Sequence, residues 1–329
     1  MCSNPGASSR QTPGVQANRS IVHHLCVRPR LIVLLLTAAI ACSSSEPAAA
    51  PPSTAAAAEC PDRSDRIDVA YVEDGDPLQR LDLYQPDLEG CDAVPIVVWV
   101  HGGGWQIGDK ANAMDDKVSL WTDAGWAVAS VNYRLTDPEA PVEERIVAPM
   151  HNEDVAAALG WLVRTAPELG VDPERIAVLG HSAGAGIAAA VAADPAYLAA
   201  EDLTPADLAC VAPLDTEGFD IRRVVAAGGP AAALYRSTFG TDPQRWGELS
   251  PMTHVGEAEL PELFLVTRGS VERRAVVADF ADAARAADGD VTIVDLPAFS
   301  HADVNRRIGD PTDEVLTPAL QRWLERCLG

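Results

Sequence analysis

The chain has little positive charge and almost no lysine. Its 329 residues include 25 Lys and Arg against 48 Asp and Glu, for a formal net charge of −23 at pH 7. Lysine occurs only as Lys110 and Lys117. A surface of this sign repels the phosphate backbone of DNA and RNA, so the composition argues against a nucleic-acid partner. We interpret the acidity as a solvated surface rather than as an acidic binding face.

Recognisable metal and phosphate motifs are missing as well. The spacing of cysteines and histidines offers no metal site. The glycine run at 102–104 is not followed by G-K-[ST], which excludes a Walker-type phosphate loop. We therefore predict neither a metal nor an organic cofactor.

Long apolar runs are scarce, and the one near the N-terminus is too short to cross a bilayer as a helix. Residues 31–40 are apolar and follow Arg28 and Arg30, the pattern of a secretory signal. The run ends in Ala-Ile-Ala at 39–41 and then Cys42. This ending resembles a bacterial lipoprotein signal, which implies a lipid on Cys42. A plain secretory signal, cleaved after a small residue, is the alternative.

Composition divides the chain into three segments. Residues 1–41 are predicted to be a signal peptide, residues 42–64 a tether rich in Ser, Pro and Ala, and residues 65–329 one folded domain. The predicted location is the bacterial cell envelope, with the membrane reached only through the lipid on Cys42, or else the secreted fraction. The oligomeric state is not readable from the sequence.

Four cysteines remain beyond Cys42, an even number that suggests disulfides in an exported chain. Cys60 and Cys91 flank a predicted hairpin and are the favoured pair. Cys210–Cys327 then follows by elimination. Buried free thiols are the alternative for both.

Strand and helix patterns alternate along the folded segment. Residues 66–72 and 79–86 alternate polar and apolar side chains and predict a β-hairpin. The alternation that follows predicts an α/β fold with a mostly parallel central sheet and helices on both faces. Residues 215–259 are less regular and are predicted to form a partial lid over the sheet edge. The other predicted strands are 95–100, 127–133, 175–180, 208–214, 262–267 and 291–297, and the predicted helices are 152–166, 183–193, 273–287 and 313–327.

The most specific chemical motif is Gly180-His181-Ser182-Ala183-Gly184, which lies between a predicted strand and a predicted helix. This is G-x-S-x-G in the context that a nucleophilic serine needs, because a sharp strand-to-helix turn exposes the hydroxyl. The helix N-terminus beneath it favours negative charge. The alternative is an ordinary turn with a serine helix cap.

A second motif, His101-Gly102-Gly103-Gly104, follows an upstream strand. Acyl transfer produces an oxyanion that needs fixed N–H donors. The amides of Gly103 and Gly104 are predicted to supply them together with Ala183, the residue after the serine. A flexible glycine-rich turn is the alternative.

The serine needs a base and an acid. His301 follows the last predicted strand and fits the chain order Ser, acid, His. Glu272 is the first acid in the loop after strand 262–267 and is predicted to orient His301. An acid opposing a helix dipole is the alternative role for Glu272, and Asp295 and Asp303 are rival candidates.

Four stretches of the sequence together resemble the α/β-hydrolase superfamily: HGGGW, NYRL, DPERIAVLGHSAGAG and SHADVNRRIGDP. More narrowly, they resemble its HGGG-bearing carboxylesterase and lipase branch, including feruloyl-esterase-like and kynurenine-formamidase-like enzymes. Three departures stand out: Ala185 replaces a glycine, Arg268-Gly269 stands where His-Gly is frequent, and the acid is glutamate rather than aspartate. The resemblance implies a structural role for Asp154.

The resemblance implies a serine esterase that works through an acyl-enzyme on a small-molecule ester. An amide, formamide or peptide hydrolase of the same fold is one alternative. A hydrolase-shaped binding protein without turnover is another, and the intact Ser182, His301 and glycine run argue against it.

Overall fold

The computed structural model describes residues 60–329. The predicted signal peptide, Cys42 and most of the predicted tether lie outside the described residues, so those predictions stay predictions. Among the described residues, no helix is both long and apolar enough to cross a membrane.

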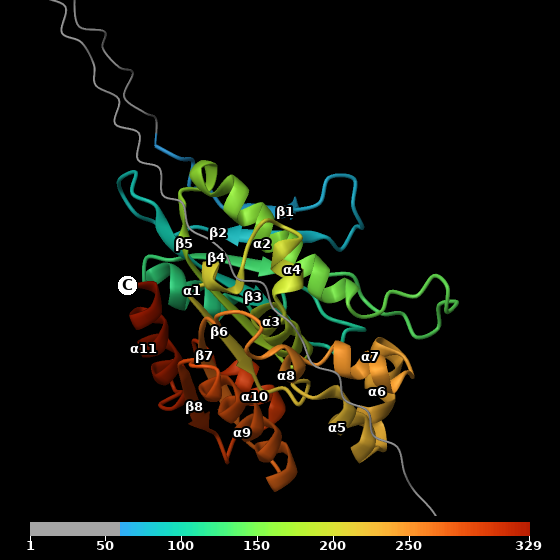
Figure 1. Cartoon of the computed structure of the whole chain (residues 1–329). Helices are drawn as coiled ribbons and strands as arrows, with labels where there is room; N and C mark the ends of the chain where they lie inside the picture. Colours follow the sequence, from blue (N-terminus) through green and yellow to red (C-terminus); the bar gives the residue numbers. More distant parts are fainter. Residues whose placement is uncertain (1–59) are drawn as a thin grey trace, which may run out of the picture. The chain divides into compact units, whose positions relative to one another are not determined.

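An eight-stranded sheet forms the centre of the described part (Figure 1). Its strands are β1 (Arg66–Ala70), β2 (Arg80–Tyr84), β3 (Val94–Val100), β4 (Ala127–Val131), β5 (Val171–His181), β6 (Cys210–Leu214), β7 (Glu262–Thr267) and β8 (Val291–Asp295). They lie in the order β1-β2-β4-β3-β5-β6-β7-β8. β2 runs antiparallel to both β1 and β4, and the remaining pairs are parallel. The predicted mixed sheet with an antiparallel hairpin at its N-terminal edge is confirmed.

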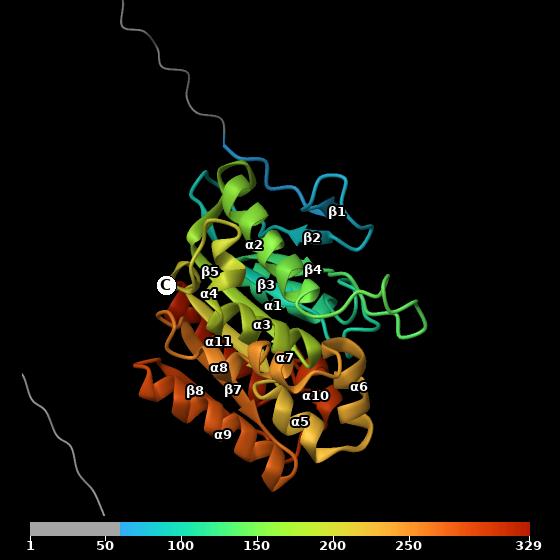
Figure 2. The same cartoon turned by 45° about the vertical axis from the view of Figure 1, so that its right-hand side comes forward.

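Helices cover both faces of this sheet, as the turned view in Figure 2 shows. They are α1 (Asp115–Asp123), α2 (Met150–Leu169), α3 (Ala183–Ala193), α4 (Pro195–Ala199), α5 (Ile221–Ala227), α6 (Gly229–Phe239), α7 (Pro243–Glu248), α8 (Pro251–His254), α9 (Val271–Ala286), α10 (His301–Arg306) and α11 (Leu316–Leu328).

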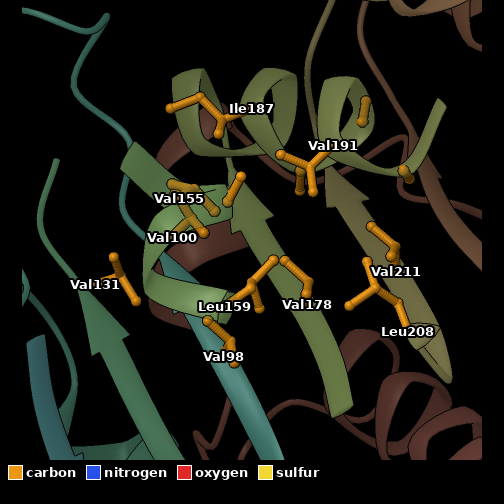
Figure 3. Packing of buried hydrophobic residues seen from close by; sticks show 14 of the residues in the cluster. Val98, Val100, Val131, Val155, Leu159, Val178, Ile187, Val191, Leu208 and Val211 are labelled. Carbon is orange, nitrogen blue, oxygen red and sulfur yellow. The ribbon is translucent and has the colours of Figure 1, made fainter. Parts of the chain in front are cut away.

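The two faces hold two separate hydrophobic clusters, which explains why β3 is apolar at every position. Val98 and Val100 pack into the cluster that includes Leu159 of α2 and Val191 of α3 (Figure 3). The side chain of Trp99, between those valines, points into the opposite cluster under α1, α10 and α11. A strand covered on both sides reads as a continuous apolar run.

The prediction that residues 215–259 form an irregular partial lid is only partly right, because this segment holds the four short helices α5, α6, α7 and α8. Asp220 and Asp242 cap two of them, and Pro251 opens the last. These helices have four to eleven residues, which is too short for a helical period of apolar residues to be recognised in the sequence. Part of the segment does lie over the sheet edge, because α6 lines a pocket there.

Both predicted disulfides are present in the structure, Cys60–Cys91 and Cys210–Cys327. The second joins the first residue of β6 to α11 near the C-terminus. The strand at the centre of the site described below is therefore tied covalently to the last helix.

Candidate active site

The site lies where the carboxyl ends of β5, β6 and β8 meet. Ser182 follows β5 directly, Asp215 follows β6 directly, and His301 opens α10 after β8. Because parallel strands end at the same edge, residues 119 positions apart come within hydrogen-bond distance.

Ser182 occupies a strained turn between β5 and α3. Its φ of +60° and ψ of −114° lie in a region that non-glycine residues rarely adopt. A side chain at Gly180 would overlap the backbone of Gly184, and one at Gly184 would overlap the carbonyl of Val100. Both glycines are therefore required for this turn, as the motif predicts.

His301 connects the serine to a buried carboxylate. Its Nε2 lies 2.8 Å from Ser182 Oγ, and its Nδ1 donates to Asp215 Oδ2 at 2.6 Å. Ser300 and Asp303 form a capping box at the start of α10, which fixes the backbone that carries His301. The arrangement has the order of contacts of a Ser-His-Asp triad.

The prediction that Glu272 orients His301 is wrong. Glu272 is an exposed acid in the first turn of α9, which was its alternative interpretation. Asp295 forms an ion pair with α9, and Asp303 accepts the capping bonds of α10. The carboxylate that contacts His301 is Asp215, on the neighbouring strand β6.

Two arginines clamp the Asp215 carboxylate, whose side chain is 2% exposed. Arg268 Nε donates to Oδ2, the oxygen that also faces His301, and Arg273 Nη2 donates to Oδ1 at 2.6 Å. Burial raises the pKa of Asp215, but the bonds from His301 and the arginines outweigh it and lower the pKa to about 2. The carboxylate is therefore ionised at any ordinary pH, and its negative charge interacts with both arginines as well as with His301.

One signal pointed to this arrangement in the sequence. Arg268 stands directly after β7, in the loop where the acid is predicted, and it replaces the histidine that is frequent there in the family that the chain resembles. Asp215 directly follows an apolar strand in the same way that Ser182 does. Sequence reasoning missed it because the segment was assigned to the lid.

The glycine run after β3 has the backbone that the oxyanion prediction requires. Gly103 and Gly104 have φ of +124° and +63°, and a side chain at Gly103 would overlap the carbonyl of Ile107. Within residues 60–329, no protein acceptor takes up the amide N–H of Gly103 or Gly104. Ala183 is the first residue of α3, so its N–H has no partner inside the helix.

Two buried histidines hold the loops of the site together. Tyr133 donates to the backbone carbonyl of His101 at 2.9 Å, and the two rings stack. His181 Nε2 donates to the carbonyl of His301 at 2.9 Å. Burial, aided by His301, lowers the pKa of His181 to about 4, so its ring is neutral and acts as a fixed donor.

Asp154 has the structural role that the resemblance implied. It is buried in α2 and accepts from Gln79 at 2.7 Å and from the backbone and guanidinium of Arg134. These bonds tie α2 to the chain after β4, away from the serine.

Pockets flank Ser182 on two sides. The α10 pocket has a volume of about 570 Å³ and includes Trp99, Ile107, Asn305 and Arg306. The α6 pocket is smaller, about 180 Å³, and is lined by side chains of α6 and by Trp105. An ester carbonyl at Ser182 thus has space for one substituent on each side.

His181, Asp215 and His301 also lie close enough together to be considered as metal ligands. The two arginines on Asp215 place positive charge where the ion would sit, and both nitrogens of His301 are already engaged. The group therefore fits a proton-transfer triad better than a cation site.

Comparisons with known proteins agree with this geometry. The BD-FAE family model matches residues 81–270, more than half of the chain. Two curated relatives come from Mycobacterium tuberculosis. "Probable carboxylic ester hydrolase LipM" is 28% identical over 60% of this chain and 46% of its own, and "Esterase LipQ" is 28% identical over 68% and 53%. The chain spans about half the length of these relatives.

Solved structures show the same fold at low identity. Esterase B from Lactobacillus rhamnosis has a TM-score of 0.66 at 22% identity, covering 82% of this chain and 88% of that one. A truncated carbohydrate esterase from gut microbiota has a TM-score of 0.65 at 18% identity, covering 82% and 99%. With its sheet order, its serine elbow and the family match, the chain belongs to the BD-FAE family and has the α/β-hydrolase fold.

Proposed function

We propose that the protein is a serine carboxylic ester hydrolase that uses Ser182, His301 and Asp215. The observation that carries the proposal is the continuous hydrogen-bond chain from Ser182 Oγ through both nitrogens of His301 to the buried Asp215. The names of the LipM and LipQ relatives support the same class of reaction.

In this mechanism His301 Nε2 takes the proton of Ser182 Oγ as the oxygen attacks the ester carbonyl. The oxyanion forms against the free amides of Gly103, Gly104 and Ala183. The protonated His301 passes its proton to the departing alcohol, which leaves an acyl group on the serine. Water, activated by the same histidine, then releases the acid.

The size of the α6 pocket sets the length of the acyl group in this proposal. Trp105, Leu234 and Tyr235 bound a volume of about 180 Å³, which suits a short acyl chain. The location at the cell envelope, through a lipid on Cys42, remains a prediction.

Hydrolysis of p-nitrophenyl acetate, butyrate and a long-chain ester tests the proposal, with Ser182→Ala run alongside. We expect turnover of the short esters and a loss of at least about 10³-fold in kcat for the alanine variant. A folded protein that hydrolyses none of these esters would contradict the proposal.

A further inference from the structure

We infer that the α10 pocket binds the alcohol part of the ester and selects alcohols that carry a carboxylate, with Arg306 as the recognising side chain. This inference rests on the proposed ester hydrolysis and adds the chemical class of the leaving group.

The argument begins from the side of the serine on which the alcohol departs. The leaving oxygen must receive its proton from His301 Nε2, so the alcohol lies beside that ring. His301 is the first residue of α10, and Ala302, Asn305 and Arg306 of the same helix line the α10 pocket. The α6 pocket includes no residue of α10 beyond His301.

The charge of the α10 pocket is opposite to that of the chain. The whole sequence has 48 acidic and 25 basic residues. Among the described residues, no Asp or Glu lines this pocket, and Arg306 is its one Lys or Arg. The α6 pocket, by contrast, contains Asp215 and Glu217 together with Arg273. The acidic surface in general repels an anion, but the positive charge of Arg306 attracts one to the pocket next to the serine.

Arg306 is available for this role, whereas the neighbouring Arg307 is engaged elsewhere. Arg307 faces Asp303 at 3.8 Å and lies 4.8 Å from the ring of Phe299, outside the pocket lining. Asp303, the carboxylate on the same turn of α10, already accepts the backbone N–H of Ser300 as part of the helix cap. Within residues 60–329, Arg306 forms no ion pair of its own.

A second positive charge lies behind the pocket wall. Lys117 is buried, and its Nζ lies 4.8 Å from the ring of Trp99, which lines the pocket. The same Nζ donates to the backbone carbonyl of Asn305 at 2.9 Å. Burial lowers the pKa of Lys117 to about 8, which leaves most of this group protonated at pH 7.

The pocket also has hydrogen-bonding groups for a polar alcohol. Asn305 lines the pocket, and its side-chain amide is a group that can hydrogen-bond a hydroxyl or amide of the alcohol. Asn112 adds a second amide to the lining. Apolar contact is left to Ile107 and Trp99.

Two acetate esters that share the acyl group and differ in charge test the inference. These are 4-acetoxybenzoate and its neutral analogue 4-acetoxybenzamide, with rates corrected for spontaneous hydrolysis. The measured quantity is the ratio of kcat/KM for the charged ester to that for the neutral ester. We expect Arg306→Gln to lower this ratio about fivefold, the effect of one exposed ion pair. Arg306→Glu should lower the ratio further.

Arg307→Gln is the matched control, because it removes the same charge one residue away and outside the pocket. It should leave the ratio unchanged. Raising the ionic strength should lower the ratio for the original protein but not for Arg306→Gln.

An unchanged ratio in Arg306→Gln, or an equal fall in Arg307→Gln, would overturn the inference while hydrolysis of the neutral ester continued. Failure of the original protein on both esters would instead count against the proposed hydrolysis itself.

Discussion

The two halves of the site are specified in different ways. The serine half consists of Gly180, Ser182 and Gly184 with the glycine run after β3, and each part is a contiguous stretch whose backbone explains its sequence. The acid half gathers Asp215 and its two arginines from three separate elements. Turn geometry is local, so a motif encodes it. Charge placement at a sheet edge depends on strand order, so no single stretch encodes it.

The largest expected effect comes from breaking the acid half at its centre. Asp215→Asn removes the carboxylate that orients His301 and stabilises its protonated form. We expect kcat for a short ester to fall by about 10³- to 10⁴-fold. The measurement is steady-state hydrolysis, with circular dichroism to confirm folding.

Glu272→Gln is the control for that variant, because Glu272 is exposed on α9. Its kcat should stay within about twofold of the original, as for surface substitutions away from a site. A large loss in Glu272→Gln together with an active Asp215→Asn would return the acid role to Glu272.

Breaking the serine half requires only one methyl group. In Gly184→Ala, the added carbon would overlap the carbonyl of Val100 and displace the turn that carries Ser182. A displacement of about 1 Å costs about 10²-fold in rate. Ala185→Gly, one position along and without such a clash, is the control, and equal rates for the two variants would contradict the steric argument.

The smallest effect concerns stability beneath the α10 pocket. Burial lowers the pKa of Lys117 from 10.5 to about 8, so between these values the unfolded chain binds more protons at this site. The stability of the original protein relative to Lys117→Met should therefore increase as pH rises from 8 towards 10.5. Urea unfolding at several pH values measures the difference.

The other lysine provides the control for that experiment. Burial lowers the pKa of Lys110, but Asp82 outweighs it and leaves the pKa raised. The stability that Lys110 adds is therefore fully present below pH 10.5, and the difference between the original and Lys110→Met should be flat from pH 8 to 10. If the stability difference between the original protein and Lys117→Met is also independent of pH, the prediction that burial lowers the pKa of Lys117 is contradicted.

Most of the sheet and the serine half of the site could be predicted from the sequence. The covered strand β3, the serine turn and His301 all have local signals, and the structure agrees with each. Helix α10 was not predicted, because its six residues are too few to show a period. The acid was missed because β6 and β7 end at the same edge, and the sequence does not say which of the two faces the histidine. The replacement of histidine by Arg268 was the visible sign that this position had changed its role.

The position of Asp215 has a consequence for how related sequences are sorted into active and inactive enzymes. A search that requires a carboxylate after β7 would select the exposed Glu272 in this chain and would classify a relative without an acid there as inactive. The geometry instead keeps an aspartate within 2.6 Å of the histidine, supplied by the adjacent strand. β6 and β7 are parallel neighbours that end at the same edge, so either strand can place a residue beside the histidine. Inactive members of such a family are therefore better identified by the whole strand edge than by one aligned column.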